Sequence, residues 1–401
     1  MSTRELRDLL EAAAGQPPHR ISAAAVRRRA ARRRMTGYVF AAAAAVLLAG
    51  AGIAVASRTG IPGPASGPRP PAGAPRYYVQ QAFTPAPPAR TVVRATATGA
   101  VTAAVRCPWG QAQPASGQIA AASHQTFFMV CQRVVRNGRR LVLTGSRIYS
   151  FRLSGAGRPR GYILVRGGAL NGLNASGLAA AANGTEIAVT AQPVTAAQDS
   201  PLTPSIIVIS TRTGARAVWP GRPAVPGKMS YTPGSLSLTA DGRELMYIAY
   251  PRCIRGRCTP TGNGQEIRAL RPAAQGGQQG SSQLVARQAA LARLPSSYLD
   301  GAIVSPTGAS VNVVLVNSPG QGPTSVSVVR ISAATGRPAR LLYRVVTGNG
   351  FSFQFFSSDP SGRYLMLDTG PSSAAVNGLI YHRKLIRLTP AAGGNVSYET
   401  W

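Results

Sequence analysis

A short pattern recurs through most of the chain and constrains its fold more than any other feature. Each copy alternates apolar and polar residues, makes a turn, and continues into an apolar strand. Three clear copies and two looser ones occupy residues 235–249, 301–315, 355–367, 177–190 and 119–130. Four copies carry a turn glycine with the conformational freedom that tight hairpins require: Gly184, Gly242, Gly308 and Gly362. The copies lie about 60 residues apart, which suits four strands and a loop per repeat.

A second hairpin follows most copies of this pattern. It is seen in residues 205–219 and 325–342, and a third version, residues 90–105, precedes the first full copy. Thr-Gly pairs at 98–99, 213–214 and 335–336 mark its turns. One pattern plus one hairpin makes a four-stranded unit, so the chain is predicted to be an all-β protein, a β-propeller of four-stranded blades.

The number of blades follows from the remaining strands. Residues 77–105 supply three more predicted strands, one short of a blade. Residues 395–401 would complete it by pairing with residues 77–83, which would join the two ends of the ring. Six blades is therefore the first prediction and seven the alternative.

The alternation of x-S-x-D-G-x-x-L-x-φ with I-x-V-φ-x-x-x-T-G-x, where φ is an apolar residue, resembles WD-repeat-like and TolB-like propellers. From its start, MSTRELRDLLEAAAG, to its end the chain is similar to uncharacterised membrane-anchored propeller proteins of high-GC Gram-positive bacteria. The resemblance implies the fold and leaves the function open. The Gly-His and Trp-Asp signatures of true WD repeats are missing, so the partner-binding rules of that family do not transfer.

An apolar segment near the N-terminus indicates a membrane anchor. Residues 37–56 carry no charge and are long enough to cross a bilayer. Six arginines lie just before this segment, which predicts a cytoplasmic N-terminus: Arg27, Arg28, Arg29, Arg32, Arg33 and Arg34. The expected order is a cytoplasmic segment (1–35), a transmembrane helix (36–57), a Pro/Gly-rich spacer (58–76) and an extracytoplasmic propeller (77–401). The alternative is a cleaved signal peptide, with secretion after the A-x-A site that ends at Ala56.

The first residues favour a short helix. Ser2 and Glu5 form a capping box, and an apolar face follows at Leu6, Leu9, Leu10 and Ala13. Such a helix is too short to be stable alone and would dock on a partner or on the membrane surface. The leading hypothesis for the whole chain is a non-enzymatic, extracytoplasmic binding or sensing propeller. The alternative is a transmembrane regulator whose residues 1–35 sequester a cytoplasmic protein, as short anti-sigma segments do. A third hypothesis, an exported hydrolase, requires an acid/base set near a mouth of the channel.

The charge balance predicts an attraction to polyanions. The chain has 44 basic and 12 acidic residues, a net charge of +32. Nine arginines against three acids give residues 1–35 a charge of +6, which leaves +26 for the rest. Anionic lipid or an anionic wall polymer is the expected partner, rather than nucleic acid, besides a protein or peptide ligand at a propeller face. Arg252, Arg255 and Arg257 are the candidate anion-binding residues.

Four cysteines lie in the region expected outside the membrane, where disulfides can form. Pairing Cys107 with Cys131 and Cys253 with Cys258 is one of three possible connectivities. Their spacing does not suit a metal site, and no metal, cofactor or catalytic residue is predicted. His124 falls in a turn and His382 beside a basic stretch, while Asp241 and Asp359 fall in hairpin turns, where Asp usually bonds its own backbone. Residues 269–288 are predicted to be a long loop.

Overall fold

The structure is a computed structural model. It describes residues 71–83, 90–110, 113–137, 140–194, 203–221, 229–253, 264–272, 282–291, 297–317, 324–347, 355–368, 377–382, 384–387 and 395–400. These residues form six antiparallel sheets of four strands each, the blades of a β-propeller. The all-β prediction and the four-stranded blades are confirmed.

The six blades follow one another along the chain. Blade 1 contains β1 (Tyr77–Phe83), β2 (Arg90–Ala95), β3 (Val101–Val105) and β24 (Asn395–Thr400). Blade 2 contains β4 (Gln113–Ala121), β5 (Thr126–Asn137), β6 (Arg140–Leu153) and β7 (Pro159–Asn171). Blade 3 contains β8 (Leu173–Ala180), β9 (Glu186–Pro193), β10 (Ser205–Ser210) and β11 (Arg216–Trp219).

The second half of the chain repeats this plan. Blade 4 contains β12 (Met229–Leu238), β13 (Leu245–Cys253), β14 (Glu266–Leu270) and β15 (Gln283–Arg287), and a four-residue helix, α3 (Gln288–Leu291), follows it. Blade 5 contains β16 (Ser297–Val304), β17 (Ser310–Asn317), β18 (Thr324–Ser332) and β19 (Pro338–Thr347). Blade 6 contains β20 (Phe355–Ser358), β21 (Leu365–Asp368), β22 (Asn377–Tyr381) and β23 (Lys384–Arg387).

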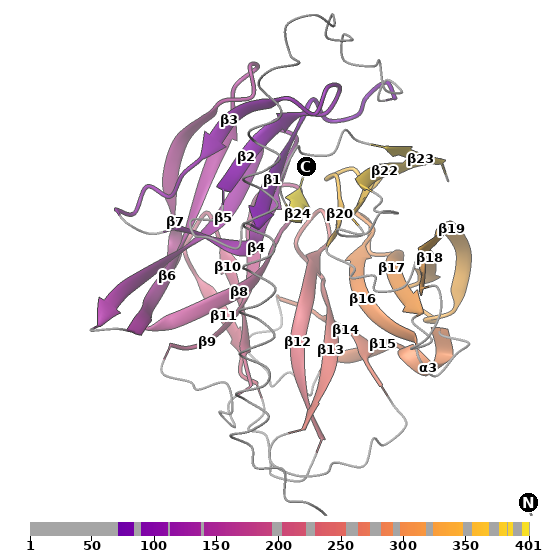
Figure 1. Cartoon of the computed structure of the whole chain (residues 1–401). Helices are drawn as coiled ribbons and strands as arrows, with labels where there is room; N and C mark the ends of the chain where they lie inside the picture. Colours follow the sequence, from indigo (N-terminus) through magenta and orange to yellow (C-terminus); the bar gives the residue numbers. More distant parts are fainter. Residues whose placement is uncertain are drawn as a thin grey trace, which may run out of the picture. The chain divides into compact units, whose positions relative to one another are not determined.

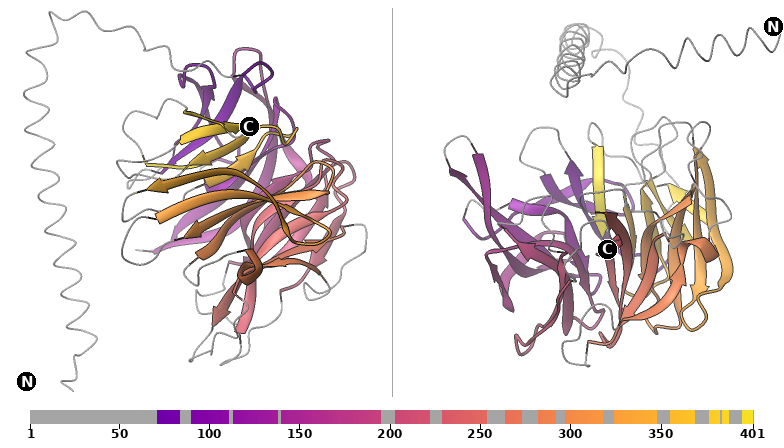
Figure 2. Two further views of the ribbon diagram at one scale, coloured as in Figure 1. Left: turned by 90° about the vertical axis from the view of Figure 1, so that its right-hand side faces the viewer. Right: turned by 90° about the horizontal axis from the view of Figure 1, so that it is seen from below.

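The two ends of the propeller sequence meet in blade 1. The C-terminal strand β24 pairs antiparallel with β1, with Gln81 opposite Tyr398. In Figure 1 the strands β24, β4, β8, β12, β16 and β20 surround the middle of the propeller, and each contacts the next around the ring. Figure 2 shows the same blades from two further directions. Closure by the C-terminal strand is confirmed, so the prediction of six blades is correct and the alternative of seven is wrong.

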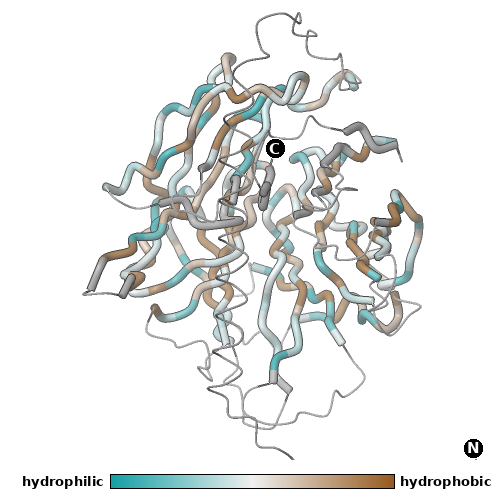
Figure 3. Tube along the Cα trace, viewed as in Figure 1, coloured by the Kyte–Doolittle hydropathy of each residue, from teal (hydrophilic) through white to brown (hydrophobic). Residues whose placement is uncertain are grey.

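The hydrophobic core lies between the blades because successive side chains of a strand point to opposite faces. Strand β9 illustrates this: Ile187 and Val189 pack against blade 2, whereas Ala188 packs against blade 4. Each of the six interfaces between neighbouring blades holds one such cluster. Figure 3 shows the hydrophobic colour running along the strands. The blades are therefore held together mainly by apolar burial.

The hairpin turns follow the predicted glycines. Gly184, Gly242, Gly308 and Gly362 have φ angles between 68° and 77°, a region that residues with a Cβ rarely adopt. Gly214 and Gly336, from the Thr-Gly pairs, have φ angles of 79° and 64°. The turn predictions are confirmed.

One predicted loop is wrong at both of its ends. Residues 269–288 were expected to be a loop, but Ala269 and Leu270 belong to β14, and residues 283–287 form β15. The Gln, Gly and Ser content masked the second strand, whose apolar signal is limited to Leu284, Val285 and Ala286.

The predicted N-terminal helix, the apolar segment 37–56 and most of the spacer lie outside the described residues. Within the described part of the chain, no helix is both long enough and apolar enough to cross a membrane.

Candidate functional site in the central channel

The inner strands of the blades surround a cavity of about 480 Å³. Its described lining comes from β4, β8, β12, β16 and β20, from the turns that follow them, and from Tyr250 on β13. These strands are the innermost of their sheets, so one edge of each is unpaired and directs backbone N–H and C=O groups toward the channel. We call this cavity the chamber.

Small residues make up half of the described chamber wall. They share the property of leaving the channel open where longer side chains would fill it: Ala120, Ala121, Gly177, Ala179, Ala180, Ala182, Ser235, Ser237, Ala240, Gly301, Ser357 and Ser358. Larger apolar groups come from Leu178, Leu236, Ile303, Tyr250 and Phe356. The chamber volume lies within the range typical of small-molecule sites.

A backbone irregularity recurs at one level of the inner strands. The pairing register shifts between Ser176 and Leu178 in β8, between Gly234 and Ser237 in β12, and between Leu299 and Gly301 in β16. Each shift is a β-bulge, in which a residue leaves the ladder and its side chain is re-aimed. The bulge residue of β16 is Asp300, which lines the chamber.

The residue after this bulge fixes the spacing between blades 5 and 6. A Cβ on Gly301 would lie 3.2 Å from both Cβ and Cδ1 of Phe356. Glycine therefore allows β16 to approach β20 closely. This contact keeps the backbone on the C-terminal side of Asp300 against the neighbouring blade.

The carboxyl group of Asp300 is half-buried, and burial raises its pKa to about 7. The Tyr250 hydroxyl donates to the backbone carbonyl of Asp300 at 3.5 Å. Burial, and then the nearby Asp300 charge, raise the pKa of both Tyr250 and Tyr298. Among the residues that the structure describes, none makes a hydrogen bond or an ion pair with the Asp300 carboxylate. Near neutral pH this group therefore changes charge with no partner among the described residues.

A second carboxylate of the chamber, Asp359, is used by its own turn. Its side chain is completely buried, Oδ1 accepts from the backbone N–H of Tyr364 at 2.8 Å, and Oδ2 accepts from that of Ser361 at 3.0 Å. The Nε2 of His124, from the turn after β4, lies 3.4 Å from the same Oδ2. The prediction that Asp359 bonds its own turn is confirmed, and the contact with His124 links blades 2 and 6.

The serine hydroxyls of the wall also make structural bonds. Ser235 Oγ accepts from the backbone N–H of Ala302, and Ser237 Oγ accepts from that of Val304, both at 3.1 Å. Ser358 Oγ donates to the carbonyl of Asp359 at 2.9 Å. These bonds satisfy backbone groups along the free edges of the inner strands. The arrangement suits binding through polar edges and one titratable carboxylate.

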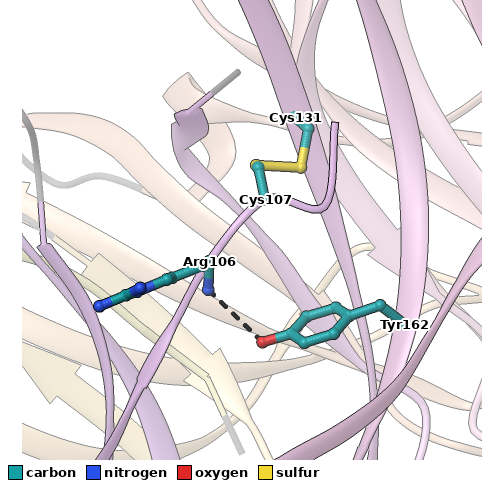
Figure 4. The surroundings of a disulfide bond; sticks show 4 residues. All are labelled: Arg106, Cys107, Cys131 and Tyr162. Carbon is teal, nitrogen blue, oxygen red and sulfur yellow. Dashed lines mark hydrogen bonds between the residues drawn. A yellow bond between two sulfur atoms is a disulfide. The ribbon is translucent and has the colours of Figure 1, made fainter. Parts of the chain in front are cut away.

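The predicted pair Cys107–Cys131 is present as a disulfide, with the two Cα atoms 5.9 Å apart. Cys107 follows β3 of blade 1 and Cys131 lies in β5 of blade 2, so the bond joins two blades (Figure 4). Beside it, the backbone N–H of Arg106 donates to the Tyr162 hydroxyl at 3.4 Å. The predicted pair Cys253–Cys258 lies outside the described side chains.

The other predicted residues that the structure describes do not line the chamber. Arg252 lies in β13 and is half-buried, with the Ser230 hydroxyl donating to its carbonyl at 3.1 Å. Arg255 and Arg257 lie outside the described residues. Asp241 bonds its own turn, as predicted, through the backbone N–H of Arg243 at 3.0 Å. His382 lies in the turn before β23, in edge contact with the ring of Tyr381.

Sequence reasoning missed Asp300, although the repeats contained a signal. When the turn glycines are aligned, Asp300 precedes Gly308 by eight residues, as Gly234 precedes Gly242 and Ser176 precedes Gly184. A charged residue therefore stands where two other copies have a small neutral one. Its direction into the channel depends on the bulge, which the sequence does not reveal.

No protein-family model matches the chain, and no curated protein sequence matches it. Solved structures of similar shape include TolB from Acinetobacter baumannii, at 15% identity and a TM-score of 0.49, covering 86% of this chain and 68% of TolB. A prolyl endopeptidase (15% identity, TM-score 0.36) and Porphyromonas gingivalis dipeptidyl peptidase 4 (10% identity, TM-score 0.35) match over 70% and 79% of this chain. The matches span only 43% and 46% of those two peptidases.

Proposed function

We propose that the chain is a membrane-tethered, extracytoplasmic binding propeller without enzymatic activity, and that its ligand occupies the chamber. One observation carries this proposal: five inner strands enclose a cavity of ligand size whose wall holds a carboxylate with no partner among the described residues. A cavity with an apolar wall and a few convergent polar groups is the usual form of a binding site.

The side chains of the chamber support binding rather than catalysis. A serine nucleophile needs an adjacent general base. Here the hydroxyls of Ser235, Ser237 and Ser358 are engaged with backbone groups, and Asp359 is engaged by its turn. The described titratable neighbours of the remaining carboxyl, Asp300, are the hydroxyl groups of Tyr250 and Tyr298. Burial raises the pKa of both tyrosines.

The proposed location rests on the N-terminal sequence and on the disulfide. The uncharged segment 37–56 and the arginines before it favour an N-terminus inside the cell, and Cys107–Cys131 suits an oxidising compartment. Single cysteines introduced between residues 60 and 75 should react with an impermeant thiol reagent in intact cells. Labelling of a cysteine introduced at position 15 instead would show that the N-terminus lies outside the cell and would contradict the proposed topology.

Blocking the chamber after folding tests the binding function. Ser358→Cys in the full-length chain, modified with a bulky maleimide, places a plug in the chamber wall. Thr335→Cys, in an exposed turn of blade 5, is the matched control. Saturation-transfer NMR with cationic, neutral and anionic fragments should show binding that the first modification abolishes and the second preserves. Equal binding to both modified proteins would contradict the proposal.

A further inference from the structure

We propose that the chamber selects a ligand carrying a protonated amine, which forms an ion pair with Asp300. This inference deepens the proposed function and rests on it. It concerns the chemistry of the ligand that the chamber holds.

The charges of the wall point to this ligand class. The titratable side chains among the described lining residues are Asp300, Asp359 and Tyr250, and none of the described lining residues is cationic. The Asp359 oxygens already accept two backbone N–H groups. Asp300 therefore offers both carboxylate oxygens to a ligand.

The distribution of arginine makes this unpaired carboxylate informative. The chain has 44 basic residues, and two of the described carboxylates, Asp241 and Glu266, are paired with arginine. Asp241 lies 3.5 Å from Arg243, and buried Glu266 lies 2.7 Å from Arg268 and 3.4 Å from Arg287. An arginine at the small positions of the chamber wall nearest Asp300 would neutralise its charge. Instead, those positions hold Ala, Gly and Ser, which leave the space beside the carboxylate open to an added cation.

An organic ammonium fits the surroundings better than a metal ion. Calcium requires six to eight oxygen ligands, and magnesium requires six in octahedral geometry. The described residues contain no group of three His, Cys, Asp or Glu side chains that could supply such a set. An ammonium needs one carboxylate and two further acceptors, which the carbonyl edges of the inner strands can provide. The rings of Tyr250 and Phe356 add apolar surface for the carbon part of the ligand.

The test compares benzylamine with its neutral counterpart, benzyl alcohol. Both are titrated by calorimetry and NMR against the full-length chain in lipid nanodiscs at pH 8. We expect benzylamine to bind at least about tenfold more tightly, because only it can pair with ionised Asp300. Asp300→Asn should remove the difference between the two probes. Asp241→Asn, which changes a turn carboxylate outside the chamber, should preserve it.

The affinity for benzylamine should also depend on pH. Among the described residues, the titratable groups that face Asp300 are Tyr250 on β13 and Tyr298 on its own strand, and both stay protonated. The β12 and β20 residues of the wall, such as Ser235 and Phe356, are uncharged. Between pH 8 and pH 5.5 the affinity should fall roughly 30-fold as Asp300 takes up a proton. His124→Gln should keep this dependence, which excludes the imidazole at the Asp359 turn as its source.

Equal affinities for the two probes, or wild-type binding of benzylamine by Asp300→Asn, would overturn the inference. The absence of any benzylamine binding at concentrations up to about 10 mM would also overturn the inference. If neutral fragments bind and are blocked by the Ser358→Cys plug while benzylamine has no advantage, the proposed function stands and this inference fails. If the Ser358→Cys plug leaves the binding of every fragment unchanged, both the proposed function and this inference fail.

Discussion

At the scale of single residues, the chamber is shaped by which positions carry no large side chain. Gly301 allows β16 and β20 to pack closely, and the bulge before it presents Asp300 to the channel. The carboxyl is thereby held where burial disfavours its charge. Such a group costs stability in the empty protein, as we expect of a residue kept for the proposed binding.

This cost predicts how Asp300→Asn changes stability with pH. The pKa of about 7 lies above the unfolded value, about 3.9, so the folded state binds the proton more tightly. The destabilisation therefore appears as the pH rises above 4 and is complete above 7. The substitution should raise the free energy of unfolding by up to about 4 kcal/mol at pH 8 and by only about 1 kcal/mol at pH 4.5. Denaturant titrations at both values measure this.

Asp241→Asn provides a control of opposite sign. The backbone N–H of Arg243 and the Thr239 hydroxyl lower the pKa of Asp241, so its ionised form stabilises the folded state. That stability is present above the unfolded pKa and is lost as the pH falls through the lower, folded one. Neutralising Asp241 should therefore lower the stability at pH 8. A gain from Asp300→Asn that was equal at pH 4.5 and pH 8 would show that burial does not shift its pKa.

At the scale of elements, the sequence predicts features that depend on local chemistry. The hairpin turns at Gly242 and Gly308 need a positive φ, and the strands beside them alternate visibly, so both could be located. The bulges could not, because they depend on how a strand pairs with its neighbour. Ser235 shows this: it adopts a φ of 48° without being glycine, in a bulge that no turn signal marks. The chamber is built from these bulges, and so its key carboxylate was missed.

The disulfide between blades 1 and 2 should contribute measurable stability. Its cysteines are 24 residues apart, and closing a loop of that length in the unfolded chain corresponds to about 3 kcal/mol. Cys107→Ala with Cys131→Ala should lower the unfolding midpoint accordingly, and a reductant should have the same effect on the wild type.

The predicted bond between Cys253 and Cys258 would close a much shorter loop. Cys253→Ala with Cys258→Ala should therefore lower the free energy of unfolding by only roughly 2 kcal/mol. Mass mapping without reduction should find Cys253 linked to Cys258, and free thiols at both would disprove that pair.

At the scale of the whole molecule, the ring is closed by the last described strand. Residues at the two ends of the propeller sequence share blade 1, so the closure of β24 on β1 joins them non-covalently. The first described residues are attached to the same ring: the Tyr364 hydroxyl of blade 6 donates to the carbonyl of Ala72 at 2.9 Å. The chain therefore enters the propeller beside the Asp359 turn of the chamber, since Tyr364 also donates its N–H to Asp359.

The outer surface predicts a second kind of binding, to polyanions. A region with a net charge of +26 should bind anionic vesicles or a phosphate-rich wall polymer at low salt. Because charges are screened over about 8 Å at physiological ionic strength, this binding should weaken steeply as salt is added.

Replacing Arg252, Arg255 and Arg257 together with Gln tests whether their loop is the anion-binding site. The control replaces three exposed arginines of blade 5, Arg337, Arg340 and Arg344, in the same way. Equal losses would show that the attraction is collective and eliminate the loop as a site, whereas a larger loss in the first variant would identify the loop. Binding that did not change with salt would contradict the electrostatic origin. Benzylamine affinity should be equal in both variants, since neither set of arginines lines the chamber.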